Sequence, residues 1–352
     1  MKKIFSDILI IGAGPTGLFT VFEAGLLGLK CHLIDALPKP GGQCSELYPK
    51  KPIFDIPGTP EILAGKLVEN LLEQIKPFQP GYTLAESADQ LIKNKDGSFD
   101  VITNKGTIHN AKVIAIAGGL GNFEPRKPFI ENISKFEGKG VEYMIKDPDI
   151  FKEKNVIISG GGDSALDWTI ELQKIAKKVT LVHRRSEFRG AIDSVTKVQK
   201  LKDQRKVNLI TPAEVVGLIG TKKIEGVAIK QVDKVTEHNA DYFVPLFGLT
   251  PRLGKLQDWG LKIEKNSIVV NNSLDYQTNI NGVFAIGDIN TYPGKLKLIL
   301  CGFHEATLMC QSAFKIIHPE KKNIFKYTTV TGVEGFDGSK KKSEGAVIKS
   351  II

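Results

Sequence analysis

The chain has 352 residues, of which 41% are hydrophobic and 25% are charged, and its formal net charge is +9. This composition is typical of a globular protein with two ordinary domains, and no run reaches the roughly 20 uninterrupted apolar residues of a membrane helix. Asp7 interrupts the apolar start and no signal-peptide cleavage site follows, so we expect a cytoplasmic location. Four scattered cysteines without metal-binding spacing predict reduced thiols and no bound metal. The absence of a nucleic-acid recognition pattern favours an acidic protein partner over DNA or RNA.

The first predicted unit begins with an apolar strand at 8–11, followed by a Gly-x-Gly-x-x-Gly turn whose glycines are Gly12, Gly14 and Gly17. A helix-like stretch and a second strand come next. Such a turn lets the backbone approach a pyrophosphate, which then lies at the positive N-terminus of the helix. The second strand ends at Asp35, 23 residues after Gly12. A carboxylate there accepts both ribose hydroxyls, so this site suits FAD or NAD.

Several elements are predicted between this unit and residue 128. Turn formers mark a loop at 38–49, and apolar periodicity indicates a helix at 61–76. Strand-like alternation at 97–108 and a strand at 113–117 follow. Residues 120–128, with one glycine and two prolines, are typical of a crossing between domains.

A second copy of the nucleotide-binding pattern starts with an apolar strand at 156–159. Its turn, at 160–165, has the form Gly-x-Gly-x-x-Ala. The candidate binding residues in this turn are Gly160, Gly162, Ser164 and Ala165. One such turn is weak evidence for a nucleotide, since glycine-rich turns also occur for structural reasons. Two turns in one chain indicate two nucleotides, as when a flavin meets a nicotinamide.

The end of the following strand distinguishes the second copy from the first. His183 lies 23 residues after Gly160, and Arg184 and Arg185 follow it. A carboxylate would repel a 2′-phosphate, whereas paired guanidinium groups bind one with charge-assisted hydrogen bonds. We therefore interpret the first site as FAD and the second as NADPH, with His183, Arg184 and Arg185 at the second. The alternative is that the two arginines form a solvated turn.

The rest of the chain contains fewer signals. Its predicted elements are strand-rich stretches at 207–231 and 242–249, a strand at 283–286 and a helix at 300–317. The turn at Gly287 and Asp288, between a buried strand and a helix, favours a cofactor contact, with an ordinary turn as the alternative. Residues 319–352 have no core periodicity and form either a flexible tail or an arm over a partner subunit.

Both nucleotide turns, together with residues 41–43 (Gly-Gly-Gln) and 282–288 (Gly-Val-Phe-Ala-Ile-Gly-Asp), resemble the thioredoxin-reductase-like flavoprotein family. The resemblance implies an α/β fold with two Rossmann-like, three-layer ββα domains, the NADPH domain being inserted in the FAD domain. The expected domains are a first FAD-binding segment at 1–120, an NADPH-binding domain at 121–281, and a second FAD-binding segment with a C-terminal arm at 282–352.

The resemblance also assigns FAD contacts to individual residues. They are Thr16 at the pyrophosphate turn, Gln43 and Tyr48 beside the flavin, Ala88 and Phe123 at the adenine or ring edges, Asp288 at the ribityl chain, and Thr329 in the returning tail. Tyr48 is expected to stack on the isoalloxazine, the alternative being a surface tyrosine before a proline. Some relatives have an aromatic or histidine residue on the other flavin face, where this chain has Thr328.

Thioredoxin reductases carry a Cys-x-x-Cys before the second nucleotide turn, but here Tyr143 and Lys146 occupy those two positions. Without the dithiol, no thiolate can pass electrons to a protein disulfide. The chain thus resembles the disulfide-free ferredoxin–NADP(+) reductases of this type, which are homodimers. This resemblance implies electron transfer between NADP(H) and ferredoxin or flavodoxin through FAD, with no catalytic side chain.

Two other functions remain open from the sequence. The first is an NADPH-dependent reductase of a small molecule or a low-molecular-weight disulfide. The second, from another class, is a flavin-binding redox sensor that contacts a partner without turnover.

Overall fold

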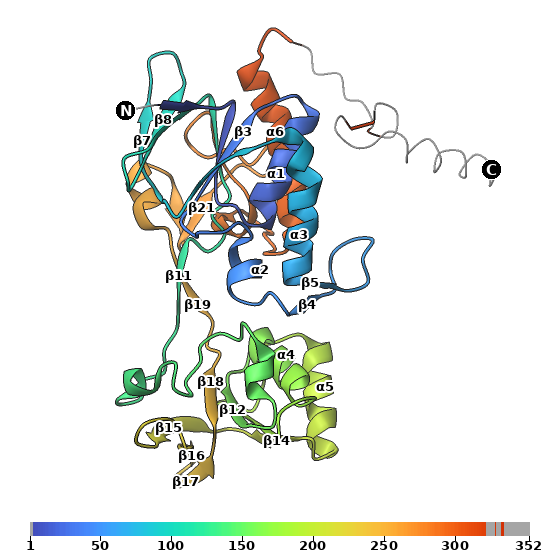
Figure 1. The fold of residues 1–352 in the computed structure, drawn as a ribbon, viewed down its shortest axis with the longest axis vertical. Helices are drawn as coiled ribbons and strands as arrows, with labels where there is room; N and C mark the ends of the chain where they lie inside the picture. Colours follow the sequence, from blue (N-terminus) through green and yellow to red (C-terminus); the bar gives the residue numbers. More distant parts are fainter. Residues whose placement is uncertain (1–2, 322–327, 329–331, 334–352) are drawn as a thin grey trace, which may run out of the picture. The chain divides into compact units, whose positions relative to one another are not determined.

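The computed structural model describes residues 3–321, 328, 332 and 333, and at residues 122–124 and 251 it describes the backbone alone. The chain divides into two compact units (Figure 1). Unit 1 comprises Met1–Asn122 and Arg252–Ile352, and unit 2 comprises Phe123–Pro251. Unit 2 is therefore an insertion within unit 1.

The centre of unit 1 is a parallel five-stranded sheet. Its strand order is β22 (Val283–Ala285), β10 (Val113–Ile116), β2 (Ile8–Ile11), β3 (Cys31–Asp35) and β6 (Gly81–Leu84). Every residue of β2, β10 and β22 is buried. This burial on both faces explains why these strands read as continuous apolar runs rather than as alternating ones.

Helices cover one face of this sheet. They are α1 (Pro15–Leu26), α3 (Ala64–Ile75) and α6 (Ile299–Ile317), which Figure 1 shows side by side, and the short α2 (Gly42–Glu46) follows β3. The buried side chains of α3 recur at helical spacing, at Leu67, Val68, Leu71 and Ile75. Helix α3 begins later than the predicted residue 61 because residues 62–63 form β5. Among the described residues, no helix is both long and apolar enough to cross a membrane.

A second sheet covers the other face (Figure 1). Its order is β1 (Lys3–Phe5), β9 (Ile108–Ala111), β8 (Phe99–Thr103) and β7 (Ala88–Lys93). Gly97, with φ of 82°, makes the hairpin turn between β7 and β8. Two smaller sheets complete unit 1, one of β4 (Pro52–Ile53) and β5 (Ile62–Leu63), the other of β20 (Ile263–Glu264), β21 (Ser267–Val269) and β23 (Asn290–Thr291).

Unit 2 repeats the arrangement on a smaller scale. Its parallel sheet has the order β14 (Val207–Ile210), β13 (Lys178–Val182), β12 (Asn155–Ser159) and β18 (Tyr242–Pro245). Helices α4 (Asp163–Leu172) and α5 (Ile192–Asp203) lie on one side of it in Figure 1. On the other side lies an antiparallel sheet of β15 (Glu214–Ile219), β16 (Gly226–Gln231) and β17 (Lys234–Asn239).

The expected domain boundary at residue 281 is wrong, because the chain rejoins unit 1 at Arg252. Strand β19 (Leu249–Arg252) pairs with β11 (Asn122–Pro125), and the following residues then pack in unit 1. Leu253, Leu256 and Trp259 are buried in the core of unit 1. The indole N–H of Trp259 also donates to the carbonyl oxygen of Asp89 at 3.1 Å. The apolar residues of 252–281 therefore complete the core of unit 1.

A buried histidine pair lies beside the parallel sheet of unit 1. The rings of His32 and His109 are 4.6 Å apart, and His32 Nε2 lies 2.8 Å from the hydroxyl oxygen of Thr83. Both ring nitrogens of His109 are buried without a hydrogen-bond partner among the described residues. Burial, followed by the proximity of His109, lowers the pKa of His32 from 6.5 to about 4. Both rings are therefore neutral in the folded protein at pH 7.

This pair predicts a loss of stability in mild acid. The folded state disfavours protonation of His32, so its contribution is present above pH 6.5 and is lost as pH falls towards 4. From pH 7 to pH 5, the free energy of unfolding should fall by about 2 kcal/mol through His32. His32→Gln removes the titrating ring, so its loss over this range should be smaller. Denaturant unfolding of both proteins at the two pH values checks this, and equal losses would contradict it.

Two candidate nucleotide-binding sites

The first glycine turn joins β2 to α1 with little room around two of its glycines. Gly12 has φ of 109°, and a methyl group there would overlap the carbonyl oxygen of Ala117. A methyl group on Gly17 would overlap the carbonyl oxygen of Gly12. Gly14 differs, because its nearest neighbour would be the Cα of Gly42, at 3.9 Å. Gly12 and Gly17 therefore shape the turn, whereas Gly14 leaves space open in front of α1.

The N-terminus of α1 has the form of an anion site. Gly14 is the N-cap, Pro15 is the first helical residue, and no side chain caps the helix. The first backbone N–H groups of the helix thus remain available to a ligand, and the helix dipole makes this end positive. An open glycine before an uncapped helix N-terminus is the cradle that a pyrophosphate needs, so these residues fit the predicted cofactor.

Asp35 holds the turn to the end of β3. One carboxylate oxygen accepts the backbone N–H of Ala13 at 2.6 Å, and the other accepts that of Leu37 at 2.8 Å. Burial raises the pKa of Asp35, although these two hydrogen bonds oppose the shift. An ionised carboxylate offers about four lone-pair positions, so each oxygen retains capacity for a ribose hydroxyl.

Thr16 joins the turn to the C-terminal part of unit 1. Its hydroxyl lies so close to Gly287 and Gly302 that a methyl group on either glycine would touch it. Gly302 is in α6, and Gly287 begins the short loop after β22 that carries Asp288. Burial raises the pKa of Asp288, while the charges of Lys297 and Lys295 oppose this. The predicted contacts Thr16 and Asp288 thus belong to one cluster.

Gln43 and Tyr48 join this cluster through α2. A methyl group on Gly42 would lie 3.1 Å from the Cα of Gly14, and one on Gly119 would lie 3.3 Å from Gln43 Nε2. Tyr48 is half-buried and shares a hydrogen bond with the thiol of Cys44, and Asp288 also acts on it electrostatically. Burial raises the pKa of the Tyr48 hydroxyl and also raises that of Cys44, to about 11.

The other predicted FAD contacts are not brought into this cluster by any described side chain. Ala88 is buried at the start of β7, in the second sheet of unit 1. Phe123 lies in β11, where its side chain is not described. Thr329 falls outside the described residues, and Thr328, which is described, is half-buried. Their roles stay predictions.

The second glycine turn, between β12 and α4, also combines a glycine that has no room for a side chain with one that leaves space open. A methyl group on Gly160 would lie 2.7 Å from the carbonyl oxygen of Leu246, whereas nothing lies within 4 Å of such a group on Gly162. Gly162 is the N-cap of α4, which has no side-chain cap. Ser164 is exposed in the first turn of the helix, and Ala165 is buried beneath it. This turn therefore offers a second open helix N-terminus. Its first residue, Asp163, is acidic, and the Asp163 carboxylate accepts the backbone N–H of Ala191 at 2.7 Å.

The buried ring of His183 packs against the backbone of this turn. Only 6% of the residue is exposed, and a methyl group on Gly161 would overlap its ring. Its Nε2 lies 3.1 Å from the carbonyl oxygen of Glu187, and its ring stacks on Phe188 with 5.0 Å between centroids. The sequence placed His183 among the ligand contacts, but its buried ring does not face solvent.

Three arginines, rather than two, surround this turn. Arg184, Arg185 and Arg189 are all exposed, and the backbone N–H of Arg189 donates to the carbonyl oxygen of Gly161 at 2.8 Å. Burial, followed by the electrostatic influence of these arginines, lowers the pKa of His183. The sequence prediction missed Arg189, although its place in the same short loop as Arg184 and Arg185 was a usable signal. The arrangement concentrates positive charge where a 2′-phosphate was predicted.

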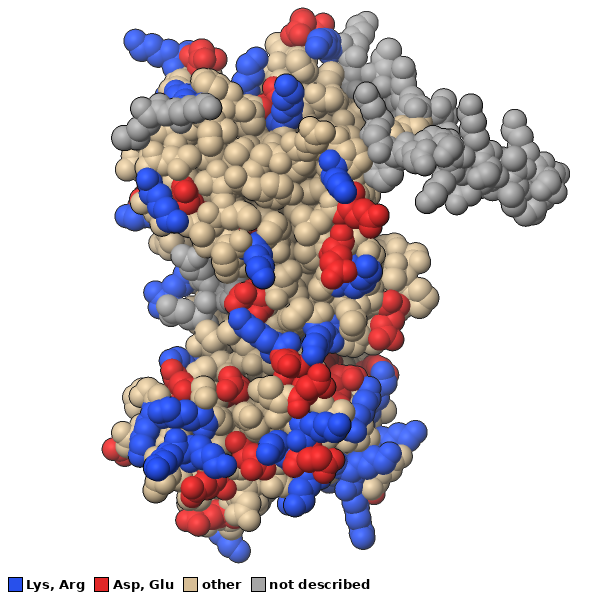
Figure 2. Space-filling model, viewed as in Figure 1, with Lys and Arg blue, Asp and Glu red and all other residues tan. Residues whose placement is uncertain are grey.

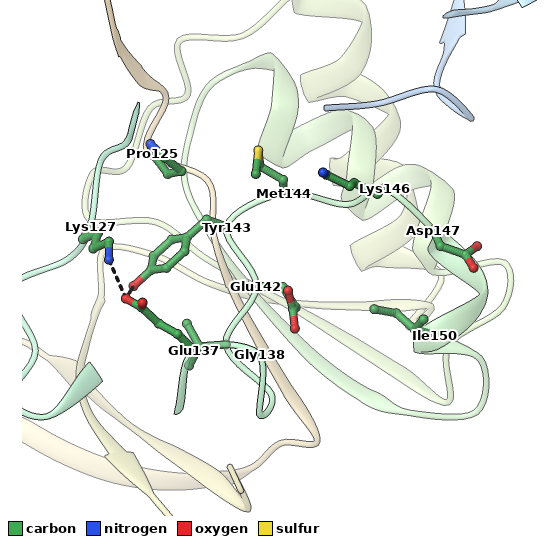
Figure 3. A pocket seen from close by; sticks show the side chains of 11 residues that line it. Pro125, Lys127, Glu137, Gly138, Glu142, Tyr143, Met144, Lys146, Asp147 and Ile150 are labelled. Carbon is green, nitrogen blue, oxygen red and sulfur yellow. Dashed lines mark hydrogen bonds and ion pairs between the residues drawn. The ribbon is translucent and has the colours of Figure 1, made fainter. Parts of the chain in front are cut away.

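The segment that carries the dithiol in thioredoxin reductases lines an open pocket of about 410 Å³ in unit 2. Figure 3 shows that Tyr143 and Lys127 both point to Glu137. The Tyr143 hydroxyl donates to Glu137 Oε1 at 3.0 Å, and the Lys127 ammonium donates to the same oxygen at 2.6 Å. All four cysteines of the chain lie elsewhere, among the described residues, as free thiols.

Residues 6–306 match the family of the pyridine nucleotide-disulphide oxidoreductases. The chain belongs to this family. Proteins named ferredoxin–NADP reductase from Flavobacterium johnsoniae and Flavobacterium psychrophilum are each 66% identical over 349 residues, or 99% of this chain and 100% and 99% of theirs. Another of that name, from Bradyrhizobium diazoefficiens, is 49% identical over 93% of this chain and 95% of its own.

Solved structures of the family show the same fold. Thioredoxin reductase from Lactococcus lactis has a TM-score of 0.76 and 24% identity, covering 89% of this chain and 99% of its own. The enzyme from T. acidophilum has a TM-score of 0.77 and 24% identity, covering 88% of this chain and 98% of its own. The predicted α/β class with two Rossmann-like domains is thereby confirmed.

Proposed function

We propose that this protein is a ferredoxin–NADP reductase whose cofactors are FAD and NADP(H). The observation that carries this proposal is the 66% identity, over nearly the whole of both chains, to proteins of that name. The two open glycine turns support it, because the reaction requires two dinucleotides in one chain. FAD, when bound, supplies the exchange between a two-electron nicotinamide and a one-electron carrier.

In this proposal, unit 1 holds FAD through its own backbone and a few side chains. The N–H groups at the start of α1 bind the pyrophosphate, and Gly14 allows their close approach. Asp35 accepts hydrogen bonds from the adenosine ribose, and Asp288 does so from the ribityl chain. Tyr48, held by Cys44, packs against the isoalloxazine. The arrangement orients the cofactor and leaves the redox chemistry to it.

Unit 2 binds NADP(H) at its own glycine turn in the same proposal. The N-terminus of α4 binds the pyrophosphate, and His183 supports the turn from below. Arg184, Arg185 and Arg189 bind the 2′-phosphate, since guanidinium groups form bidentate hydrogen bonds with phosphate. This contact selects NADPH over NADH.

Three of the four cysteines are unsuited to a thiol relay. Burial raises the pKa of Cys31 and Cys310 well above the usual value and that of Cys44 to about 11, so these three thiols are protonated at neutral pH. A thiol relay needs a thiolate as nucleophile. None of these three thiols is therefore suited to the small-disulfide reductase that remained open from the sequence, and the fourth, Cys301, is a half-buried free thiol.

Flavodoxin as a second partner, the homodimer and the cytoplasmic location are further parts of this proposal. An acidic partner agrees with the net charge of +9. Figure 2 shows basic and acidic side chains interspersed on the visible face. We expect the run of three lysines at 340–342 to take part in docking an acidic partner, and these residues fall outside the described ones.

A comparison of electron acceptors tests this function. The FAD-loaded protein is mixed with NADPH and, in parallel, with ferredoxin, thioredoxin or a small disulfide such as cystine. We expect rapid reduction of ferredoxin and almost none of the other two. Turnover with cystine alone would favour the small-disulfide reductase, and FAD binding without turnover would favour the redox sensor.

A further inference from the structure

A buried carboxylate on α6, that of Glu305, accepts hydrogen bonds from several residues of one loop of unit 1, residues 287–295. Glu305 is 0% exposed, and its Oε2 accepts the backbone N–H of Gly287 at 2.6 Å and the Asn290 amide at 2.8 Å. Its Oε1 accepts the Tyr292 hydroxyl at 2.8 Å and the ammonium group of Lys295. All four donors come from residues 287–295, the loop that carries Asp288.

The same helix also contacts the first glycine turn. Gly302, three residues before Glu305, lies against the Thr16 hydroxyl, and so does Gly287. The loop that carries Asp288 is thus held by Thr16 on the turn and by Glu305 on the helix, in addition to the pairing of β23 with β21. A shift of Glu305 would move Asp288 relative to the pyrophosphate end of α1.

Burying two charges costs their hydration free energy, which suggests that this arrangement does more than stabilise the fold. Lys295 and Glu305 have side chains only 6% and 0% exposed, and they form a buried ion pair. A buried ion pair is often no more stabilising than apolar residues of the same size, because both charges lose their hydration. Four donors on one carboxylate do, however, fix a loop in a single position, since each buried donor left unpaired would be costly.

We propose that Glu305 is a positioning residue for the flavin site, fixing the loop of residues 287–295 so that Asp288 faces the cofactor. This inference rests on the proposed function, because it assumes that FAD occupies the site in unit 1. The residue acts through the loop, as Glu305 itself is buried behind it. Its loss should therefore change how tightly and in what environment the flavin is held.

The test uses the full chain freed of FAD and compares Glu305→Gln with Glu320→Gln. Glu320 is an exposed carboxylate just after the same helix, so the second variant is the matched control. We expect Glu305→Gln to raise the dissociation constant of FAD about tenfold or more and to shift the visible spectrum of the bound flavin. The control should match wild type in both measurements. Wild-type affinity and spectrum in a folded Glu305→Gln protein would overturn the proposal.

Two further variants keep the test decisive if Glu305→Gln does not fold. Tyr292→Phe removes a single hydrogen bond to Oε1 and should raise the dissociation constant of FAD by a smaller factor, with a spectral shift in the same direction. Lys295→Met leaves the carboxylate buried without its cation, so adding Glu305→Gln to it should restore part of the lost affinity. Wild-type behaviour of Tyr292→Phe, or no restoration in the double variant, would overturn the proposal.

The outcome for the wild-type protein separates this inference from the proposed function. If the wild-type chain binds no FAD, the proposed function fails and this inference fails with it. If the wild-type chain binds FAD and reduces ferredoxin while Glu305→Gln does so with unchanged affinity and spectrum, only the role of Glu305 is wrong.

Discussion

Replacing Arg184 and Arg185 together by alanine is expected to raise the Michaelis constant for NADPH by about a hundredfold and to leave that for NADH nearly unchanged. Each charge-assisted contact to phosphate contributes roughly 1.5–3 kcal/mol to the binding free energy. NADH has no 2′-phosphate and therefore does not form the contacts that the substitution removes. Arg189→Ala alone should show a smaller effect of the same kind, because it removes one guanidinium group instead of two and leaves the backbone hydrogen bond to Gly161 in place.

Steady-state kinetics with both nucleotides and a small one-electron dye as acceptor measures this effect. Arg205→Ala is the matched control, since Arg205 is also an exposed arginine of unit 2 but precedes β14, at the opposite end of the parallel strands from the turn that follows β12. The control should leave both constants unchanged. Equal losses for NADPH and NADH in the double variant would show that Arg184 and Arg185 only shape the loop.

Adding one methyl group to each open glycine should affect one cofactor at a time. Gly14→Ala should weaken FAD binding, and Gly162→Ala should weaken NADPH binding, each between about tenfold and a hundredfold. Neither methyl group meets a protein atom closer than 3.9 Å. Each would instead occupy the space where we place a pyrophosphate. The fold should tolerate both changes, with a loss of about 1 kcal/mol at each N-cap.

The dissociation constants of both nucleotides, measured for each variant by titration, test this assignment. Gly217→Ala, in strand β15 and away from both turns, serves as the control for adding a methyl group to a glycine. If Gly14→Ala lowers the affinity for NADPH and leaves that for FAD unchanged, the assignment of the two cofactors to the two turns is reversed. Unchanged affinities in both variants would mean that neither turn holds a pyrophosphate.

The sequence predicted those parts of the sites that depend on short-range patterns. The glycine spacing placed both turns between a strand and a helix, and the structure shows why, since Gly12 and Gly17 have no room for a side chain. Asp35 was also predicted, because an acid at the end of the second strand follows from the length of the unit. These features depend on residues close together in the chain.

Features that depend on tertiary packing were missed. The hydrogen bonds of Glu305 join residues that are 10 to 18 positions apart in the sequence, and no local sequence pattern predicts them. The one available signal was a glutamate on the buried face of helix 300–317. The chain returns to unit 1 at Arg252, whereas the sequence predicted this return at residue 282. The prediction was wrong because the apolar residues around Trp259 are compatible with the core of either unit.

The central claim is that this protein passes electrons from NADPH to a one-electron carrier, and a stoichiometric titration tests it most directly. A limited amount of NADPH is added, without oxygen, to the FAD-loaded protein and an excess of oxidised ferredoxin. The account predicts two molecules of ferredoxin reduced for each NADPH consumed, because the nicotinamide gives two electrons and ferredoxin accepts one. Consumption of NADPH while ferredoxin stays oxidised would contradict it.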